Sequence, residues 1–418
     1  MPLTFFINYY IIISRGDRMI KREIEVKFKR LSNSRKVILI TGSRQVGKST
    51  FVKNLKEEDR TYVTLDDLSL RELAQNDPKL FLMNYPGKII IDEVQYAPNL
   101  FPYIKMDVDE TGEYGKYWLT GSQRFELLNN VSESLAGRVS ILEMSTLSYA
   151  EKEGFESKLF NPTDIHNNIK IDPNNIFENI FRGGMPEYIC NAIDRNQFFD
   201  DYVRTYLERD VRQLTQVGDL MRFRKFMIAV ASRNGEVLNY SSLSEDADID
   251  VNTVKRWLAV LEANDIVYLL KPYSNNKLKR AIKSPKVYFL DTGLCSFLSG
   301  WNSKEALESS AMAGHFLKSF VISELVKNKR NNKETLNYDF YYYRDRDQKE
   351  IDLIIELDNI IYPFEIKKTA NPSLSMIKNF SVLNNNGLKV GNGGLLCFYP
   401  DIIPLDEHNK SYPLTVIF

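Results

Sequence analysis

Residues 42–49 read GSRQVGKS, and this octapeptide constrains the fold of the chain more than any other segment. It fits the pattern GxxxxGK[ST], follows an apolar run (VILIT, 37–41) typical of a buried strand, and leads into a helix-like segment (STFVKNLK). The two glycines let the backbone wrap closely enough for successive N–H groups to point at phosphate oxygens, and the positive end of the new helix adds to the attraction. The sequence therefore predicts a strand–loop–helix unit that binds a nucleotide.

Each part of this loop has an expected role. Lys48 would reach the β- and γ-phosphates of ATP, and the Ser49 hydroxyl would bind Mg²⁺. The alternative interpretation is a glycine-rich strand-to-helix turn without a ligand. The predicted nucleotide contacts are Gly42, Ser43, Arg44, Gln45, Val46, Gly47, Lys48, Ser49 and Thr50.

Three further positions complete the predicted nucleotide site. In the run 88–93 (KIIIDE), Asp92 follows three isoleucines and is the expected Mg²⁺ ligand, while Glu93 is the expected base that polarises the attacking water. Ser122 ends the strand-like run 116–122 and would sense the γ-phosphate, or it would serve only in a turn. Arg138 follows a glycine at a helix end, where it would reach the phosphate of a neighbouring subunit in a homo-oligomer or simply face solvent.

The apolar runs at 37–41, 61–66, 88–93, 116–122 and 139–144 alternate with helix-like segments. Most of these runs are continuously apolar, which is typical of parallel strands covered on both faces. The sequence predicts an α/β fold with a three-layer, parallel-sheet P-loop core. The expected divisions are an N-terminal extension (1–18), the P-loop core (19–155), a helical connector (156–215), a winged-helix region (216–300) and a restriction-endonuclease-like α/β domain (301–418).

The order of motifs resembles a known family. GSRQVGKST, TLDD, IIIDEVQ, LTGSQ and SLAGR are similar to the motifs of prokaryotic AAA-type (AAA+-related) P-loop ATPases that carry a nuclease-like C-terminal domain of unknown function. RGGMPEY (182–188), TYLERDVRQL (205–214) and VYFLDTGL (287–294) resemble that family as well. The resemblance covers residues 19–418 and implies ATP binding and hydrolysis, but it does not supply a substrate.

A second set of charged residues lies near the C-terminus. Asp352 stands in the run EIDLIIEL, and Glu365 and Lys367 stand in YPFEIKK after an Asp358-Asn359 turn. Residues two apart in a strand share a face, so pairing of the two strands would bring both carboxylates and the ammonium together. Such a group can hold Mg²⁺ and activate water for phosphodiester attack.

Glu324, on the preceding helix, is the expected further ligand of that metal. The D…ExK arrangement looks like the PD-(D/E)xK nuclease superfamily. The alternative is a pair of surface charges on a hairpin, which the apolar neighbours disfavour.

The region 216–300 reads as three helices and a two-stranded ribbon, the order of a winged helix. DNA is the expected partner of a basic loop and of two residues on the third helix. An acidic run (Glu245, Asp246, Asp248, Asp250) opposes this, and a solvated loop or a lid on the P-loop core explains the same residues. The basic residues are Lys255, Arg256, Lys271, Lys277, Lys279, Arg280, Lys283 and Lys286.

Composition limits the remaining function classes. Lys+Arg and Asp+Glu both number 55, so any binding of nucleic acid must come from a local patch. The three isolated cysteines and the eleven-residue apolar run 3–13 predict a cytoplasmic protein that does not cross a membrane. Two functions remain open: an ATPase that processes nucleic acid, and an ATP-gated regulator whose nuclease-like domain only binds a partner.

Overall fold

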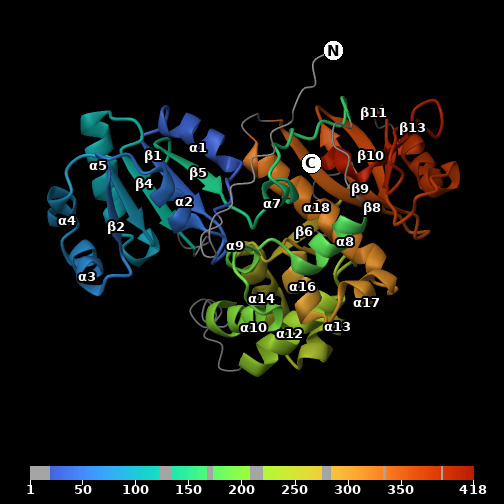
Figure 1. Ribbon diagram of the computed structural model, residues 1–418, viewed down its shortest axis with the longest axis horizontal. Coiled ribbons are helices and arrows are strands. Elements are labelled where there is room, and N and C mark those ends of the chain that lie inside the picture. Colours follow the sequence, from blue (N-terminus) through green and yellow to red (C-terminus); the bar gives the residue numbers. More distant parts are fainter. Residues whose placement is uncertain are drawn as a thin grey trace, which may run out of the picture.

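The computed structural model describes residues 19–122, 131, 134–166, 173–207, 220–274, 284–332, 336–386 and 389–418. Two sheets organise them: a five-stranded sheet near the N-terminus and a nine-stranded sheet that contains the C-terminal strands. In Figure 1 the first sheet lies on the left, the C-terminal strands lie on the right, and helices from the middle of the chain lie beneath.

The first sheet is parallel throughout, with the strand order β2-β3-β4-β1-β5. The predicted parallel sheet is therefore confirmed. Because β4 lies between β1 and β3, its carboxyl end falls between the glycine-rich loop and the acidic pair. The strands are β1 (Val37–Thr41), β2 (Thr61–Thr64), β3 (Ile89–Asp92), β4 (Tyr117–Gly121) and β5 (Val139–Glu143).

Helices cover both faces of this sheet, which confirms the three-layer core. Neighbouring residues of β1 point to opposite sides, so Ile38 joins a hydrophobic core with Phe28 of α1, whereas Leu39 joins a second core with Phe101 of α5. The covering elements are α1 (Ile24–Ser32), α2 (Lys48–Leu55), α3 (Leu68–Asn76), α4 (Pro78–Asn84), the 3₁₀ turn η1 (Val94–Tyr96) and α5 (Leu100–Thr111).

The middle of the chain is mainly helical. It contains α7 (Tyr149–Glu153), α8 (Pro173–Arg182), α9 (Pro186–Cys190), α10 (Arg195–Tyr202), the π-helical turn η2 (Val203–Leu207), α12 (Leu220–Ser232), α13 (Tyr240–Ala247), α14 (Val251–Ala263), α16 (Thr292–Leu298) and α17 (Lys304–Ser309). The helices α12 to α14 precede the antiparallel pair β6 (Val267–Pro272) and β7 (Lys286–Phe289), which is the expected succession of elements.

The ribbon β6–β7 is not separate from the strands that follow. Lys271 and Pro272 of β6 pair in parallel with Tyr341 and Tyr342 of β8, so the ribbon extends the C-terminal sheet. This pairing satisfies backbone groups that an isolated edge strand would leave open. The sequence, which placed a two-stranded ribbon in a unit of its own, did not predict this continuity.

The nine-stranded sheet is mixed. Strands β8, β9 and β10 are antiparallel neighbours, while β10, β12 and β14 run parallel. Asp358 and Asn359 join β9 to β10 with φ of 52° and 62°, the geometry of a tight two-residue hairpin turn. The strands are β8 (Tyr338–Arg344), β9 (Glu350–Leu357), β10 (Ile360–Ile366), β11 (Lys389–Val390), β12 (Gly394–Cys397), β13 (Ile403–Pro404) and β14 (Lys410–Pro413).

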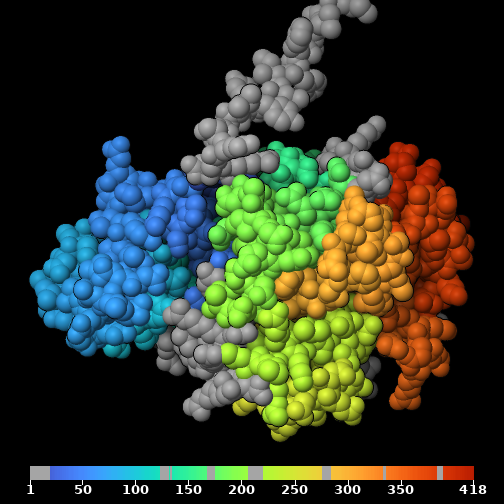
Figure 2. Space-filling model, turned by 60° about the horizontal axis from the view of Figure 1, so that its bottom comes forward, coloured from blue at the N-terminus to red at the C-terminus, as the bar shows by residue number. Residues whose placement is uncertain are grey.

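Helix α18 (Ala313–Asn331) runs through the centre of this part of the molecule, with most of its residues buried. One hydrophobic core extends from Tyr149 to Phe418 and includes residues of α12, α14, α18 and the nine-stranded sheet. Figure 2 shows the green and yellow middle segments packed between the blue N-terminal part and the orange and red C-terminal segments. The turns η3 (Leu374–Asn386) and η4 (Leu414–Ile417) complete the fold.

Among the helices that the structure describes, none combines the length and the apolar character required to cross a membrane.

Candidate nucleotide and metal sites

The glycine-rich loop connects β1 to α2 and needs glycine at two positions. Gly42 has φ of 149° and Gly47 has φ of 90°, values that side chains with a Cβ disfavour. A Cβ on Gly42 would also lie 2.1 Å from the carbonyl oxygen of Met144. The loop therefore packs directly against the segment that follows β5.

Lys48 is buried at the base of this loop. Its Nζ donates hydrogen bonds to the carbonyl oxygens of Gly42 (2.9 Å) and Ser43 (2.7 Å). The ammonium thus lies inside the curve of the loop, where the charged oxygens of a polyphosphate would be stronger acceptors than neutral carbonyls. This position fits its predicted role.

Ser49 and Asp92, the two predicted Mg²⁺ ligands, are in direct contact. The Ser49 hydroxyl donates to Oδ1 of Asp92 at 3.0 Å. Tyr62 donates to Oδ2 at 2.6 Å, and Thr120 also donates to Oδ1. Burial and the Asp92 carboxylate raise the pKa of Tyr62, so its hydroxyl remains a donor. Two oxygen ligands side by side, with the carboxylate held by its neighbours, fit a magnesium ion.

Glu93 has the left-handed backbone conformation, with φ of 57°. Its N–H donates to the Thr120 hydroxyl at 3.2 Å, and its carboxylate accepts hydrogen bonds from Gln95 and, at 3.4 Å, from Ser122. The structure therefore brings Ser122 to Glu93. Gln95 and Tyr62 are contacts that the sequence did not predict, because no spacing rule links them to the motif.

Arg138 lies at the opposite edge of the sheet from the glycine-rich loop. Its carbonyl accepts from Val37 at the start of β1, whereas the loop follows the end of that strand. The guanidinium makes two hydrogen bonds to Asp109, at 2.7 and 2.8 Å. Arg138 is therefore remote from the nucleotide loop of its own chain, and both the predicted role toward a neighbouring subunit and the alternative of a surface arginine stay open.

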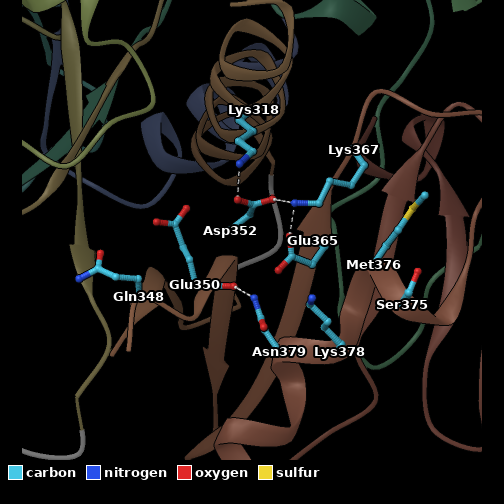
Figure 3. A pocket seen from close by; sticks show the side chains of 10 residues that line it. All are labelled: Lys318, Gln348, Glu350, Asp352, Glu365, Lys367, Ser375, Met376, Lys378 and Asn379. Atoms are coloured by element: carbon cyan, nitrogen blue, oxygen red, sulfur yellow. Dashed lines mark hydrogen bonds and ion pairs between the residues drawn. The ribbon is translucent and has the colours of Figure 1, made fainter. Parts of the chain in front are cut away.

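The C-terminal carboxylates meet in a pocket of about 320 Å³ on the nine-stranded sheet (Figure 3). Nζ of Lys367 lies 2.6 Å from Glu365 and 3.2 Å from Asp352, and the N–H of Ile366 donates to Asp352 at 3.1 Å. Lys318 of α18 forms a further ion pair with Asp352. The predicted grouping of Asp352, Glu365 and Lys367 is thus present in the structure.

The two carboxylates titrate in opposite directions. Burial raises the pKa of Asp352, but the ammonium groups of Lys318 and Lys367 outweigh it and hold this pKa well below its usual range. For Glu365, burial and the neighbouring Asp352 charge raise the pKa to about 8. Of the two carboxyl groups in the pocket, Asp352 therefore loses its proton more readily than Glu365.

Glu324 does not join this pocket. Its carboxylate accepts from the N–H of Tyr149 at 2.7 Å and pairs with Lys327 at 2.9 Å. Glu324 follows Lys318 by six residues, so it points roughly 120° away from Lys318 around the helix. The sequence showed that α18 was a helix but not which face it turned to the sheet, and Lys318 rather than Glu324 faces Asp352.

The basic residues of the predicted winged helix fall into three groups. Lys286 is buried and pairs with Glu350, whereas Lys255, Arg256 and Lys271 are exposed. The remaining four, Lys277, Lys279, Arg280 and Lys283, lie outside the described residues. Contact with DNA through this region stays a prediction.

The raised pKa of Glu365 predicts a pH-dependent stability. Between its ordinary value of 4.5 and about 8, the folded chain keeps a proton that the unfolded chain has released. Wild-type stability should therefore fall, relative to that of Glu365→Gln, as the pH rises through this window, because the folded state binds more protons. Thermal unfolding of both proteins in EDTA, at roughly pH 5 and roughly pH 8.5, measures the change. A difference in melting temperature that is the same at both pH values would contradict it.

Comparison with known proteins gives three family matches. Residues 34–153 match the family described as AAA domain, residues 173–305 match a domain of unknown function (DUF8612), and residues 313–417 match another (DUF4143). An AAA domain implies ATP binding, typically with Mg²⁺.

Relatives are found in bacteria and archaea. The uncharacterized protein Rv2008c of Mycobacterium tuberculosis is 30% identical over 360 residues, which cover 85% of this chain and 75% of that protein. The uncharacterized protein MJ1637 of Methanocaldococcus jannaschii is 24% identical over 326 residues, covering 69% and 67%.

Among solved structures, the Thermotoga maritima RuvB Holliday junction branch migration motor is 13% identical with a TM-score of 0.28, covering 59% of this chain and 87% of that one. AMPPCP-bound DnaA from Aquifex aeolicus also has a TM-score of 0.28, at 12% identity, covering 57% and 85%. Scores this low support no inference about function. At 30% identity over most of both chains, this chain belongs to the same family as the mycobacterial protein, and in this chain an AAA domain is followed by the domains DUF8612 and DUF4143.

Proposed function

We propose that the protein is a Mg²⁺-dependent ATPase whose nucleotide cycle serves binding and cleavage of nucleic acid at the carboxylate pocket of the C-terminal sheet. The observation that carries the ATPase assignment is the 3.0 Å contact between Ser49 and Asp92 next to the glycine-rich loop. Bound Mg²⁺ would neutralise phosphate charge at these two oxygens.

Glu93 supplies the base in this proposal. Its carboxylate follows Asp92 directly and accepts hydrogen bonds from Gln95 and Ser122. A carboxylate oriented by two donors is suited to hold a water in line with the terminal phosphate. Ser122, which touches Glu93 at the end of β4, would report the presence of that phosphate to the base.

Arg138 would act on a neighbouring subunit. Replacing it by Ala should lower ATP turnover by at least about tenfold without weakening ATP binding, because an arginine finger acts on transition-state charge. Asp109→Ala is the matched variant, since it removes the partner of Arg138 and leaves the guanidinium in place. Phosphate release at several protein concentrations provides the measurement. Equal turnover of wild type and Arg138→Ala would remove this role.

The cleavage proposal is supported by the chemistry of the pocket. Asp352 and Glu365 offer two carboxylates, and Mg²⁺ commonly binds one or two carboxylates and keeps several waters. No group of three or more His, Cys, Asp or Glu side chains suited to a metal occurs in the described part of the chain. Two carboxylates with an adjacent Lys367 are sufficient to hold the ion and orient a water toward a phosphodiester.

Positive charge surrounds the pocket. Lys318, Lys367 and Lys378 line it, and Lys286 pairs with Glu350 at its edge. A phosphodiester backbone that entered here would meet ammonium groups on several sides. Lys286, the last of the basic residues in the predicted wing, is buried beside Glu350, so strand β7 adjoins the pocket.

A second candidate function is an ATP-gated regulator without cleavage. The observation in its favour is that Asp352 already pairs with Lys318 and Lys367, so the pocket is neutralised without a metal. Incubation of the protein with plasmid DNA, Mg²⁺ and ATP separates the two candidates. Metal-dependent nicking supports the first, while DNA retention in a gel without nicking, weaker as salt rises, supports the second.

A further inference from the structure

Arg22 contacts the nucleotide loop and the helical part of the chain at the same time. It precedes α1 and is buried. One guanidinium nitrogen donates to the carbonyl oxygen of Val46 at 2.7 Å, another donates to the carbonyl oxygen of Ser145 at 2.7 Å, and Nε donates to Glu151 at 2.9 Å. A single side chain therefore joins the glycine-rich loop to the segment that leaves β5 and to α7.

A single rigid peptide group links the contact between Arg22 and Val46 to the predicted phosphate-binding loop. The carbonyl of Val46 and the N–H of Gly47 belong to the same planar trans peptide, so they point in opposite directions. Arg22 holds the carbonyl side, and the Gly47 N–H is left to face the other side, where a phosphate would bind. A phosphate that accepts a hydrogen bond from this N–H would therefore also displace the carbonyl group to which Arg22 donates.

Glu151 connects Arg22 to the start of α7. Its Oε1 also accepts from the N–H of Glu23 at 2.9 Å, and its Oε2 accepts from the N–H of Ser148 at 2.9 Å. Ser148 in turn caps the helix by accepting from the N–H of Glu151. The side chain of Glu151 is fully buried, so the Arg22–Glu151 pair is not loosened by solvent.

The first turn of α7 is tied to α18. The N–H of Tyr149 donates to Oε2 of Glu324 at 2.7 Å, and Lys327 bridges Glu324 and the carbonyl oxygen of Leu147. Glu324 therefore has a structural task that the sequence did not indicate. It fixes the helix whose Lys318 pairs with Asp352 in the carboxylate pocket.

We propose that Arg22 is a positioning residue: when a nucleotide occupies the glycine-rich loop, Arg22 passes the change on, so that Lys318 shifts its position at the carboxylate pocket. The shift passes in order through the Val46–Gly47 peptide, Arg22, α7, Glu324 and α18. Glu324 and Lys318 lie six residues apart on a rigid helix, about 9 Å along its axis, so a shift at one is transmitted to the other. This inference rests on the proposed binding of ATP.

Hydrogen exchange with and without Mg²⁺ and the non-hydrolysable analogue AMPPNP tests the proposal. In the wild type, the analogue should slow exchange at least about fivefold in peptides that cover α7 and α18, as well as in the glycine-rich loop. Arg22→Lys keeps a charge for Glu151 but cannot reach all three partners. It should bind the analogue within about threefold of wild type and lose the response of α7 and α18. Arg35→Lys, at an exposed position, is the matched control.

A double substitution tests the contact between α7 and α18. Glu324→Met combined with Lys327→Met removes the ion pair and the hydrogen bonds that join α7 to α18, while the ring contact of Tyr149 with Phe320 remains. The analogue should then still slow exchange in α7 but much less in α18. An unchanged α18 response in either variant would overturn the proposal, and so would a wild type that binds the analogue but responds only in the loop. If calorimetry detects no binding to the wild type, the proposed ATPase function fails as well.

Discussion

Glu93→Gln is expected to lower the steady-state turnover of ATP by at least about 100-fold, since loss of a general base typically costs two or more orders of magnitude. Binding of Mg·ATP should stay within about threefold of wild type, because the glutamine keeps the size of the side chain and Asp92 is untouched. Phosphate release and equilibrium binding measure the two quantities separately.

The control for this substitution is Glu113→Gln at an exposed position of the same domain, which should behave like the wild type. Turnover by Glu93→Gln at the wild-type rate would remove Glu93 from the role of base. Loss of binding in Glu93→Gln would instead show that the residue belongs to the ligand contacts.

Asp352→Asn should reduce Mg²⁺-dependent nicking of supercoiled plasmid by at least about 100-fold, because several kcal/mol of transition-state stabilisation depend on a correctly held metal. The asparagine keeps the shape of the side chain and removes the charge that Lys318 and Lys367 contact. ATP turnover should persist, since Asp352 lies on the other sheet.

Asp339→Asn is the matched control for this change. Asp339 stands on the neighbouring strand β8, and its side chain is 67% exposed. It should nick like the wild type. Nicking by Asp352→Asn at the wild-type rate would exclude the pocket as the site of cleavage and leave the ATP-gated regulator as the account of the C-terminal sheet.

The parts of the fold that could be predicted from the sequence are those with local signals. The continuous apolar runs gave the parallel sheet, and the turn residues Asp358 and Asn359 indicated the hairpin that brings Asp352 to Glu365 and Lys367. Those signals act over a few residues, because strand spacing and turn geometry are local properties.

Contacts between distant segments could not be predicted in this way. Arg22 lies 24 residues before Val46 and 129 before Glu151, and no spacing rule joins them. Helical periodicity places Glu324 and Lys318 on α18 but does not say which face meets the sheet. The continuity of β6 with β8 likewise depends on tertiary packing.

The glycines in RGGMPEY and VYFLDTGL also acquire a physical explanation only in the structure. A Cβ on Gly183 would lie 2.3 Å from Oδ1 of Asp291, and one on Gly293 would lie 2.4 Å from the carbonyl oxygen of Arg182. The two motifs therefore meet backbone to backbone, and the N–H of Gly184 donates to Asp291 at 2.8 Å. Their resemblance to a family reflects a structural junction in this chain.

Calorimetric titration of the protein with Mg·ATP tests the central claim most directly. The wild type should bind with measurable affinity, and Lys48→Ala should bind at least about 100-fold more weakly, since the ammonium inside the loop is the main charge available to the terminal phosphates. The exposed Lys79→Ala provides the control. A wild type without measurable affinity for Mg·ATP, or a Lys48→Ala variant that binds as tightly as the wild type, would contradict the account.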